Sequence, residues 1–353
     1  MRTFENHARI LDPVPRAVVN ALGRLERAAG EAAAKKAQSA DALKTLIRVA
    51  RIQSTEASNA IEDISASPER LKALMRESTA PANRDEAQIA GYRYVLDLIH
   101  TSAEHMTPFS ENLVKQLHQN LYRFTPERHP GDYKTGPNDV RETRADGTVI
   151  VRFRPVEPAE TRTLFMPELH RRYSELRDLD RYHPLLLLVA YVFDFLMIHP
   201  FQDGNGRTSR LITLLLMYQA GHEVGRYVSL ERMINETRET YYEALQRSTV
   251  GWHDGEHTIW PWVEYVFGTF IAAYGELNDR MVLAAPHGSK QPAIRAFIRS
   301  RMTDEFTIDD IRSATTASDA LIKKVLGELQ RDGAVRIVMK GRYARYRRLH
   351  TGF

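Results

Sequence analysis

The chain has 353 residues, 43% of them hydrophobic, so it is long enough to form more than one domain with a substantial core. It contains no cysteine, which excludes disulfides and thiolate metal sites and fits a reducing compartment. The net charge of +4 is mild and does not by itself indicate nucleic acid. The N-terminus lacks the apolar stretch of a signal peptide, and the longest apolar run, 185–193, is too short for a membrane span. We therefore expect a cytoplasmic protein with no membrane partner.

Most of the first 285 residues have the apolar spacing of helices, and prolines divide them into separate segments. The one clear strand signal in this part lies within 131–153, where Asp146 and Gly147 separate two β-prone runs. This pattern predicts a β-hairpin with a tight turn. The helices that we expect after the hairpin begin at Pro158 and then span 184–198, 208–219, 229–246 and 260–278.

The C-terminal segment has a different texture. Residues 284–290 combine small residues, Pro and Gly without periodicity, which is typical of a linker. Beyond them, the order helix, short strand, helix, helix and hairpin predicts a winged-helix domain over 291–353. This segment holds 13 Lys and Arg against 7 Asp and Glu.

The basic surplus favours DNA as a partner of this domain, with 318–331 as the recognition helix. The residues predicted to contact phosphates are Lys323, Lys324, Arg342, Arg345, Arg347 and Arg348. The alternative is a protein-interaction or dimerisation module. The sequence does not decide between them, and a homodimer also stays open.

The loop after the apolar helix is built for an anion. Gly204 and Gly206 flank Asn205, and a helix-forming run follows directly. A glycine-rich turn that enters a helix presents free backbone N–H groups at the positive end of the helix dipole. Arg207 and Arg210 add charges suited to phosphate oxygens. These residues predict phosphate binding.

Two further side chains in the loop suggest the chemistry. His199 is the nearby group that accepts a proton at neutral pH. Asp203 is an oxygen ligand of the kind that Mg²⁺ takes while it bridges phosphates. Base, carboxylate and anion site together predict phosphoryl or nucleotidyl transfer.

The run from His199 to Arg210, HPFQDGNGRTSR, matches the Fic motif His-x-Phe-x-Asp/Glu-Gly-Asn-Gly-Arg-x-x-Arg at every fixed position. Over roughly 50–285 the chain therefore resembles the Fic family. The resemblance implies a mainly α fold, with a helical core and a β-hairpin flap, that transfers AMP from ATP to a protein hydroxyl.

In that family the histidine, here His199, deprotonates the hydroxyl, and the acidic residue, Asp203, holds Mg²⁺. The resemblance also implies that the turn of Gly204, Asn205 and Gly206 cradles phosphates and that Arg210 grips the γ-phosphate. Arg207 is a phosphate contact or a structural one. Kinase relatives carry lysine where this chain has Gly206, so the glycine favours nucleotidyl transfer.

An inhibitory helix is suggested by residues 54–64. Ser58 and Glu62 are four residues apart, so they share one face of a helix. They resemble the Fic inhibitory motif Ser/Thr-x-x-x-Glu-Gly/Asn, although Asp63 stands where Gly or Asn is usual. The resemblance implies that Glu62 pairs with Arg210 and blocks the γ-phosphate site. An ordinary solvent-facing helix is the alternative.

The predicted domains are a helical region at 1–107, a Fic core at 108–283, the linker and the winged-helix domain. The resemblance assigns the hairpin 131–153 as a flap that docks a protein substrate by strand addition, the alternative being a plain surface hairpin. The leading function is a protein adenylyltransferase that uses Mg-ATP and is autoinhibited by Glu62. The rivals are a de-AMPylase, a transferase for another NTP, and a DNA-binding regulator with a nucleotide-sensing Fic core.

Overall fold

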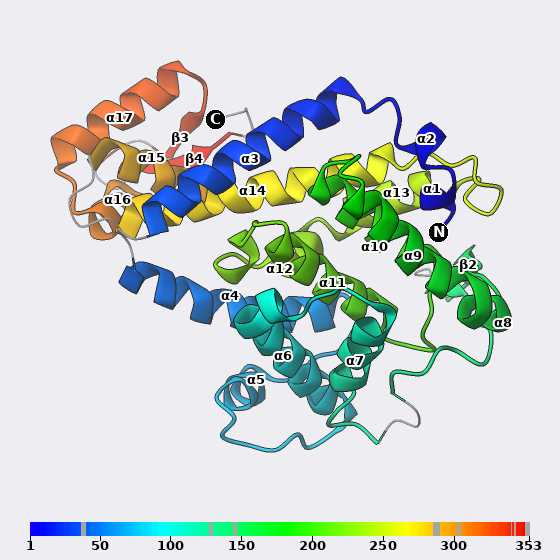
Figure 1. The fold of residues 1–353 in the computed structure, drawn as a ribbon. Coiled ribbons are helices and arrows are strands. Elements are labelled where there is room, and N and C mark those ends of the chain that lie inside the picture. The colour runs from blue at the N-terminus through cyan, green and yellow to red at the C-terminus, as the bar shows by residue number, and fades with distance from the viewer. Residues whose placement is uncertain are drawn as a thin grey trace. The chain divides into compact units, whose positions relative to one another are not determined.

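The computed structural model is mainly helical, as predicted, and divides into two compact units, Met1–Ala29 with Ile47–Ile271, and Gly30–Leu46 with Ala272–Phe353 (Figure 1). Among the described residues, no helix combines the length and apolar character that a membrane span requires. The structure describes residues 1–36, 40–126, 130–143, 147–284, 290–301, 305–339, 341 and 344–349.

The N-terminal helices begin where the sequence offers capping residues. Ser67, Asn83 and Ser110 each precede a helix, and each side chain accepts a hydrogen bond from a backbone N–H of the first turn. The helices of this part are α1 (Arg2–Glu5), α2 (His7–Ile10), α3 (Arg16–Lys36), α4 (Ala40–Ala60), α5 (Pro68–Met75), α6 (Arg84–Ser102), η1 (Ala103–His105) and α7 (Glu111–Leu121).

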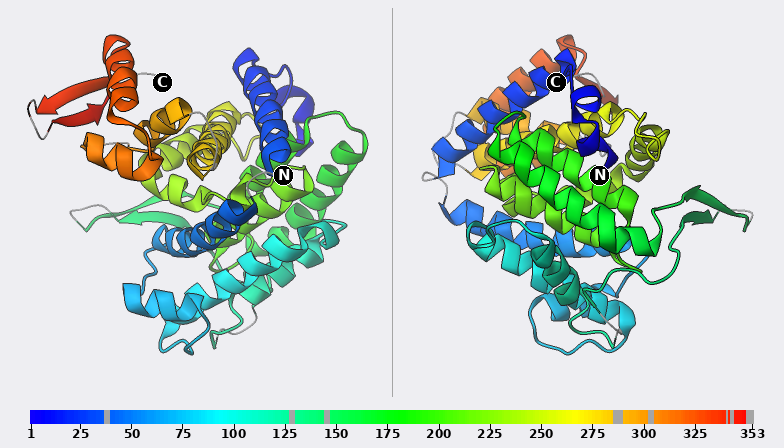
Figure 2. Two further views of the ribbon diagram at one scale, coloured as in Figure 1. Left: turned by 90° about the vertical axis from the view of Figure 1, so that its left-hand side faces the viewer. Right: turned by 45° about the vertical axis from the view of Figure 1, so that its right-hand side comes forward.

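The predicted hairpin is present as two short antiparallel strands, β1 (Val140–Thr143) and β2 (Val149–Phe153). It extends away from the helices of its unit (Figure 2). The strands fill only part of the predicted 131–153 stretch, since 131–139 is irregular. The turn residue Asp146 lies outside the described residues.

The helices after the hairpin depart from prediction at three places, one of which is the helix expected over 260–278, which runs on to Ala284. The helix expected from Thr208 begins three residues earlier, at Asn205, because Gly204 adopts the left-handed conformation that caps it (φ 76°). The helix expected over 229–246 is broken at Thr237 into two. The elements here are α8 (Pro158–Glu160), the π-helical turn η2 (Thr161–Phe165), α9 (Met166–Asp178), α10 (Pro184–Ile198), α11 (Asn205–Gln219), η3 (Val224–Arg226), α12 (Leu230–Glu236), α13 (Arg238–Thr249) and α14 (Trp260–Ala284).

Helix α10 is the central element of its unit, with every residue from Leu185 to Ile198 buried. Asp194 is among these buried residues. It ends the apolar run in the sequence, but the helix continues past it. Its carboxylate accepts hydrogen bonds from Trp252 Nε1 (2.8 Å) and Thr3 Oγ1 (2.8 Å). Hydrogen bonding lets a carboxylate occupy the core without breaking the helix.

The C-terminal elements follow the predicted order. They are α15 (Lys290–Ser300), α16 (Ile308–Thr315), α17 (Asp319–Arg331), β3 (Val335–Met339) and β4 (Arg345–Arg348), and β3 pairs antiparallel with β4. The strand expected before α16 is reduced to one bridge, between Phe306 and Tyr346. Both side chains belong to an apolar core that α15, α16 and α17 share. Residues 285–289 of the predicted linker lie outside the described residues.

Candidate active site

The loop between α10 and α11 is held in one shape by its own side chains. The amide of Asn205 accepts a hydrogen bond from Phe201 N (2.9 Å) and donates one to Phe201 O (2.7 Å). Gly204 lies against Tyr122, where a Cβ would come within 2.7 Å of the phenol oxygen. The Asn205 side chain therefore shapes the turn, while the first backbone N–H groups of α11 lie at the helix end that in general suits an anion.

His199 lies at the end of α10, in the left-handed conformation (φ 51°). Its Nδ1 is 3.2 Å from the carbonyl oxygen of Leu196. A carbonyl only accepts, so Nδ1 carries the ring proton and Nε2 keeps its lone pair. Burial lowers the pKa of His199 to about 4. The ring is therefore neutral at physiological pH and can accept a proton.

Two residues before the hairpin hold this loop in place. Asn138 Nδ2 donates to the carbonyl oxygens of His199 (2.8 Å) and Phe201 (2.7 Å). Lys134 Nζ donates to Ile198 O (3.1 Å) and to Asn138 Oδ1 (2.9 Å). Burial lowers the pKa of Lys134 to about 8. The sequence analysis assigned no role to either residue, because their hydrogen bonds to the His199 loop join segments more than 60 positions apart.

Asp203 is an exposed carboxylate beside this anion end. Its Oδ1 accepts a hydrogen bond from Gly204 N (2.7 Å), and its Oδ2 lies 3.8 Å from Arg207 and 3.9 Å from Arg84. Partial desolvation by the surrounding protein raises the pKa of Asp203, but the charge of Arg207 and hydrogen bonds from Tyr122 and Gly204 outweigh it and leave the pKa below its usual value. The carboxylate is therefore ionised at neutral pH.

His118 on α7 fixes the backbone of Asp203. Its Nδ1 accepts a hydrogen bond from Gly131 N (2.9 Å), so its Nε2 carries the proton and donates to Asp203 O (3.0 Å). The ring stacks on Phe201 with centroids 3.7 Å apart. Phe201 is fully buried, as expected of an anchor. No spacing pattern points to His118, because its hydrogen-bond partners come from two other segments.

The two arginines of the motif occupy different environments. Arg207 is buried, donates to Tyr122 Oη (2.9 Å) and lies over the Tyr122 ring. It thus makes the structural contact that was one of its two predicted roles. Arg210 Nη2 instead forms an ion pair with Glu62 Oε1 (2.9 Å).

Ser58, near the end of α4, also binds Arg210. Arg210 Nε donates to Ser58 Oγ (2.8 Å), and Arg210 Nη2 donates to Ser58 O (2.8 Å). The Glu62 carboxylate lies over the first turn of α11, where a Cβ on Gly206 would collide with it. A protein carboxylate thus lies at the anion-binding end of the helix.

One expectation for this segment was wrong. The helix predicted over 54–64 ends at Ala60, so Glu62 lies in the following turn and not on the helical face of Ser58. The turn places Asp63 in the left-handed conformation (φ 57°). That conformation favours Gly and Asn and tolerates Asp, which explains physically why Asp63 fits where the family motif has Gly or Asn.

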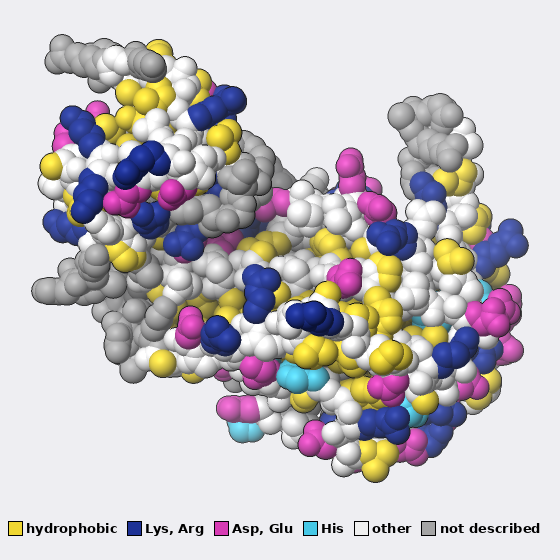
Figure 3. Space-filling model, turned by 90° about the horizontal axis from the view of Figure 1, so that it is seen from above, with side chains coloured by type: hydrophobic (Ala, Val, Ile, Leu, Met, Phe, Trp, Pro, Cys, Tyr) yellow, Lys and Arg dark blue, Asp and Glu magenta, His cyan; other side chains and the backbone are white. Residues whose placement is uncertain are grey.

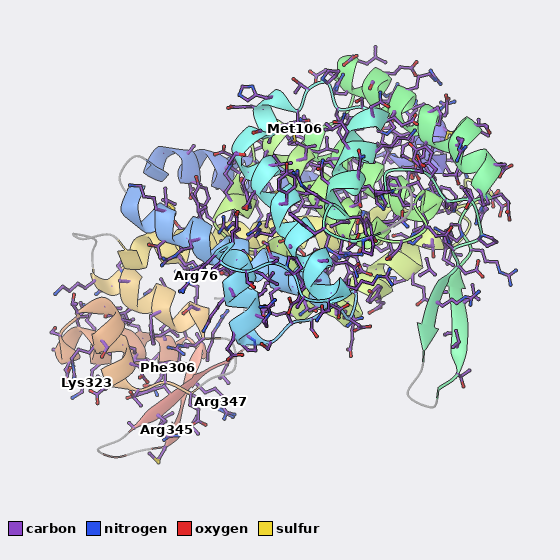
Figure 4. All side chains as sticks on the ribbon, turned by 90° about the horizontal axis from the view of Figure 1, so that it is seen from below. Arg76, Met106, Phe306, Lys323, Arg345 and Arg347 are labelled. Atoms are coloured by element: carbon purple, nitrogen blue, oxygen red, sulfur yellow. The ribbon has the colours of Figure 1, made fainter. Side chains whose placement is uncertain are left out.

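In the C-terminal unit, several of the predicted phosphate contacts are in ion pairs. Arg345 and Arg347 both pair with Glu305 while their side chains stay 57% and 40% exposed (Figure 4). Lys323 and Lys324 are exposed on α17. Asp and Glu side chains also lie among the basic side chains on the face of this unit seen in Figure 3. Arg342 lies outside the described residues. The ion pairs with Glu305 therefore neutralise part of the predicted basic surface without burying it.

Comparison with known proteins identifies part of the chain. Residues 108–217 match the model of the Fic/DOC family. A stretch of 70 residues, 20% of this chain, is 36% identical to Protein adenylyltransferase Fic of Aedes aegypti and spans 13% of that protein's length.

Solved structures show the same fold. A Fic domain containing signaling protein from Bacteroides thetaiotaomicron has a TM-score of 0.60 at 22% identity, covering 75% of this chain and 98% of that one. A Fic family protein from Desulfovibrio desulfuricans has a TM-score of 0.60 at 21% identity, covering 96% and 98%. Fic-1 from C. elegans has a TM-score of 0.60 at 19% identity, covering 75% and 72%.

Proposed function

We propose that this chain, which contains a Fic/DOC-family domain at residues 108–217, is a protein adenylyltransferase. It transfers AMP from Mg-ATP to a Ser, Thr or Tyr hydroxyl of a protein, itself included, and is autoinhibited by Glu62. The observation that carries the proposal is the Glu62–Arg210 ion pair, because it puts an internal carboxylate beside the helix end that the motif provides for phosphates.

The residues at the loop fit a Mg²⁺ ion that arrives with a nucleotide. Among the described residues, no three His, Asp or Glu side chains gather into a complete metal site. Mg²⁺ is commonly held by one or two carboxylates together with substrate phosphates, and the ionised Asp203 suits that arrangement. When bound, the ion would neutralise charge on the phosphate oxygens.

The reaction follows from the positions of the chain's own groups. The target hydroxyl oxygen attacks the α-phosphorus, and its proton passes to Nε2 of His199. The bond between the α-phosphorus and the bridging oxygen breaks, and pyrophosphate leaves with that electron pair. The N–H groups at the start of α11 and the guanidinium of Arg210 hold the phosphates in line for this displacement.

Autoinhibition follows from competition at Arg210. While Glu62 occupies the guanidinium, a γ-phosphate cannot make the same contact, and ATP is not oriented for attack. The Glu62 side chain is 36% exposed and lies in a turn, so it can leave without unfolding α4. In the active enzyme Arg210 then faces the γ-phosphate.

The hairpin β1–β2 supplies the docking surface for the protein target in this proposal. Asn138 joins the base of the hairpin to the His199 loop, so a strand added there brings a hydroxyl close to the base. Val149 and Val151 are 55% and 43% exposed, as expected of apolar side chains that a bound protein would cover. Val151→Pro, which removes a backbone donor, should reduce transfer to a protein target and leave ATP binding unchanged.

The test is incubation with Mg²⁺ and α-³²P-ATP of the wild type, His199→Ala and Glu62→Gly. We expect strong labelling of Glu62→Gly, weak labelling of the wild type and none of His199→Ala. If another labelled NTP modifies the protein and ATP does not, the substrate is that other nucleotide. Loss of AMP from a labelled protein would indicate the reverse reaction. Nucleotide binding without transfer by any variant would favour a regulator, and a duplex DNA shift assay of the whole chain would then test its C-terminal unit.

A further inference from the structure

Behind Arg210, a second carboxylate is connected to the same guanidinium. Glu231, near the start of α12, is 1% exposed, and Tyr92 on α6 is fully buried. Tyr92 Oη donates to Glu231 Oε1 (3.0 Å), and Ser229 Oγ donates to Glu231 Oε2 (3.2 Å). Ser58 lies between this pair and Arg210, because its hydroxyl accepts from Arg210 Nε (2.8 Å) and is near enough to Tyr92 to lower the pKa of that phenol.

The protons in this chain have one consistent direction. Arg210 can only donate, so the Ser58 oxygen accepts from it and the Ser58 proton points to Tyr92. Burial raises the pKa of Tyr92 well above its usual value, so the phenol keeps its proton and donates it to Glu231. Hydrogen bonds aligned in one direction reinforce each other in a low-dielectric interior. In this alignment the negative charge of Glu231 and the positive charge of Arg210 lie at opposite ends of the chain.

The two carboxylates differ in how firmly they are held. Glu62 is 36% exposed at its side chain and follows the end of α4. Glu231 is almost completely buried and is bound at both oxygens. A buried guanidinium that loses its only counter-charge pays a large desolvation cost and tends to shift towards water. Within the part of the chain that the structure describes, Glu231 is the buried carboxylate of this cluster that stays in place after Glu62 has left.

We propose that Glu231 is a positioning residue that acts through Tyr92 and Ser58 to hold Arg210 ready for the γ-phosphate once Glu62 has withdrawn. This inference rests on the proposed function, in which Arg210 binds that phosphate. It divides the predicted inhibitory pair into two roles: Glu62 inhibits, whereas Ser58 supports the active site. Ser58→Ala should therefore fail to activate the enzyme, in contrast to Glu62→Gly.

The experiment uses the full chain in the Glu62→Gly background and measures equilibrium binding of ATP and ADP by calorimetry. Tyr92→Phe, Glu231→Gln and Ser58→Ala should each weaken ATP binding about five- to tenfold, in line with the loss of one hydrogen bond to a charged group. ADP has no γ-phosphate, so its affinity should change less than about twofold. Tyr265→Phe is the matched control, since Tyr265 lines the same cavity as Arg210 but its hydroxyl bonds to Thr237.

Equal weakening of ATP and ADP, or no weakening of either, would overturn the inference. If Glu231→Gln does not fold, Tyr92→Phe decides, because it removes one hydroxyl and keeps the ring. The binding measurement needs no chemistry, so its outcome can be separated from that of the transfer assay. Absence of AMP transfer by Glu62→Gly would count against the proposed function, whereas unchanged ATP selectivity in an active Glu62→Gly enzyme would count against the Glu231 relay alone.

Discussion

The loop His199–Arg210 and the segment that carries Glu62 meet at Arg210 but are held in opposite ways. The loop is fixed from several sides, by the Asn205 amide, by Asn138 from the hairpin and by His118 from α7. Glu62 is held by an ion pair in a turn just beyond a helix end. This difference suits the proposed function, in which the loop must keep reacting groups in line and Glu62 must be able to leave at little cost.

The rigidity of the loop is tested most severely by Asn205→Ala in the Glu62→Gly background. The change leaves the buried N–H and C=O of Phe201 without the Asn205 amide, at about 1–3 kcal/mol for each lost partner. Because a shift of about 1 Å costs about a hundredfold in rate, we expect AMP transfer to fall by about that factor. Label incorporation and thermal unfolding measure the two effects.

Gln202→Ala is the control from the same loop. Gln202 is exposed and makes one long hydrogen bond to Pro137 O (3.3 Å). Its loss should change the transfer rate less than about twofold, as is usual for exposed side chains. A similar collapse in both variants would mean that the loop is not fixed by the Asn205 amide.

The support of Asp203 from α7 is tested by His118→Phe. Phenylalanine keeps the stack on Phe201 but loses the hydrogen bonds to Asp203 and Gly131. We expect the Mg²⁺ concentration for half-maximal transfer to rise about tenfold, as for other groups that orient a metal ligand. An unchanged Mg²⁺ requirement would show that Asp203 does not depend on His118.

The weaker hold on Glu62 is tested by Asp63→Ala. Alanine tolerates the left-handed conformation at φ 57° less well than Asp, by about 1 kcal/mol. The turn should open more often, and basal AMP transfer should rise about fivefold, well below the effect of Glu62→Gly. Asp63→Asn, which keeps that tolerance, is the control. The substitution should have no effect once Glu62 is glycine.

The smallest effect is expected from pH. The pKa of His199 is lowered to about 4, chiefly by burial, and the base works in its unprotonated form. Activity is therefore present above that pKa and lost as the pH falls through it. Between pH 5.5 and 7.5, kcat/KM of the Glu62→Gly enzyme should vary less than about twofold. An acid limb near pH 6.5 would show that the base is solvated in the free enzyme.

Much of the fold was readable from local patterns. Apolar spacing predicted α10, the Asp146–Gly147 turn predicted the hairpin, and the motif His199–Arg210 located the candidate site. These features depend on neighbours a few residues apart, so periodicity and turn chemistry are sufficient. Boundaries were less certain, because a capping conformation such as that of Gly204 is not written in the hydrophobic pattern.

The sequence by itself determined which residues could do the chemistry, namely a base, a carboxylate, an anion-binding turn and two arginines. Tertiary structure alone decided their surroundings. It brought Glu62 to Arg210 across 148 positions of the chain, and it placed Arg207 where its guanidinium donates a hydrogen bond to Tyr122. It also brought His118, Asn138 and Glu231 into hydrogen bonds with Asp203, His199 and Tyr92, which are far from them in the sequence. The physical reason is that the strength of hydrogen bonds and ion pairs depends on the distance between atoms in space, and the packing of the helices sets that distance.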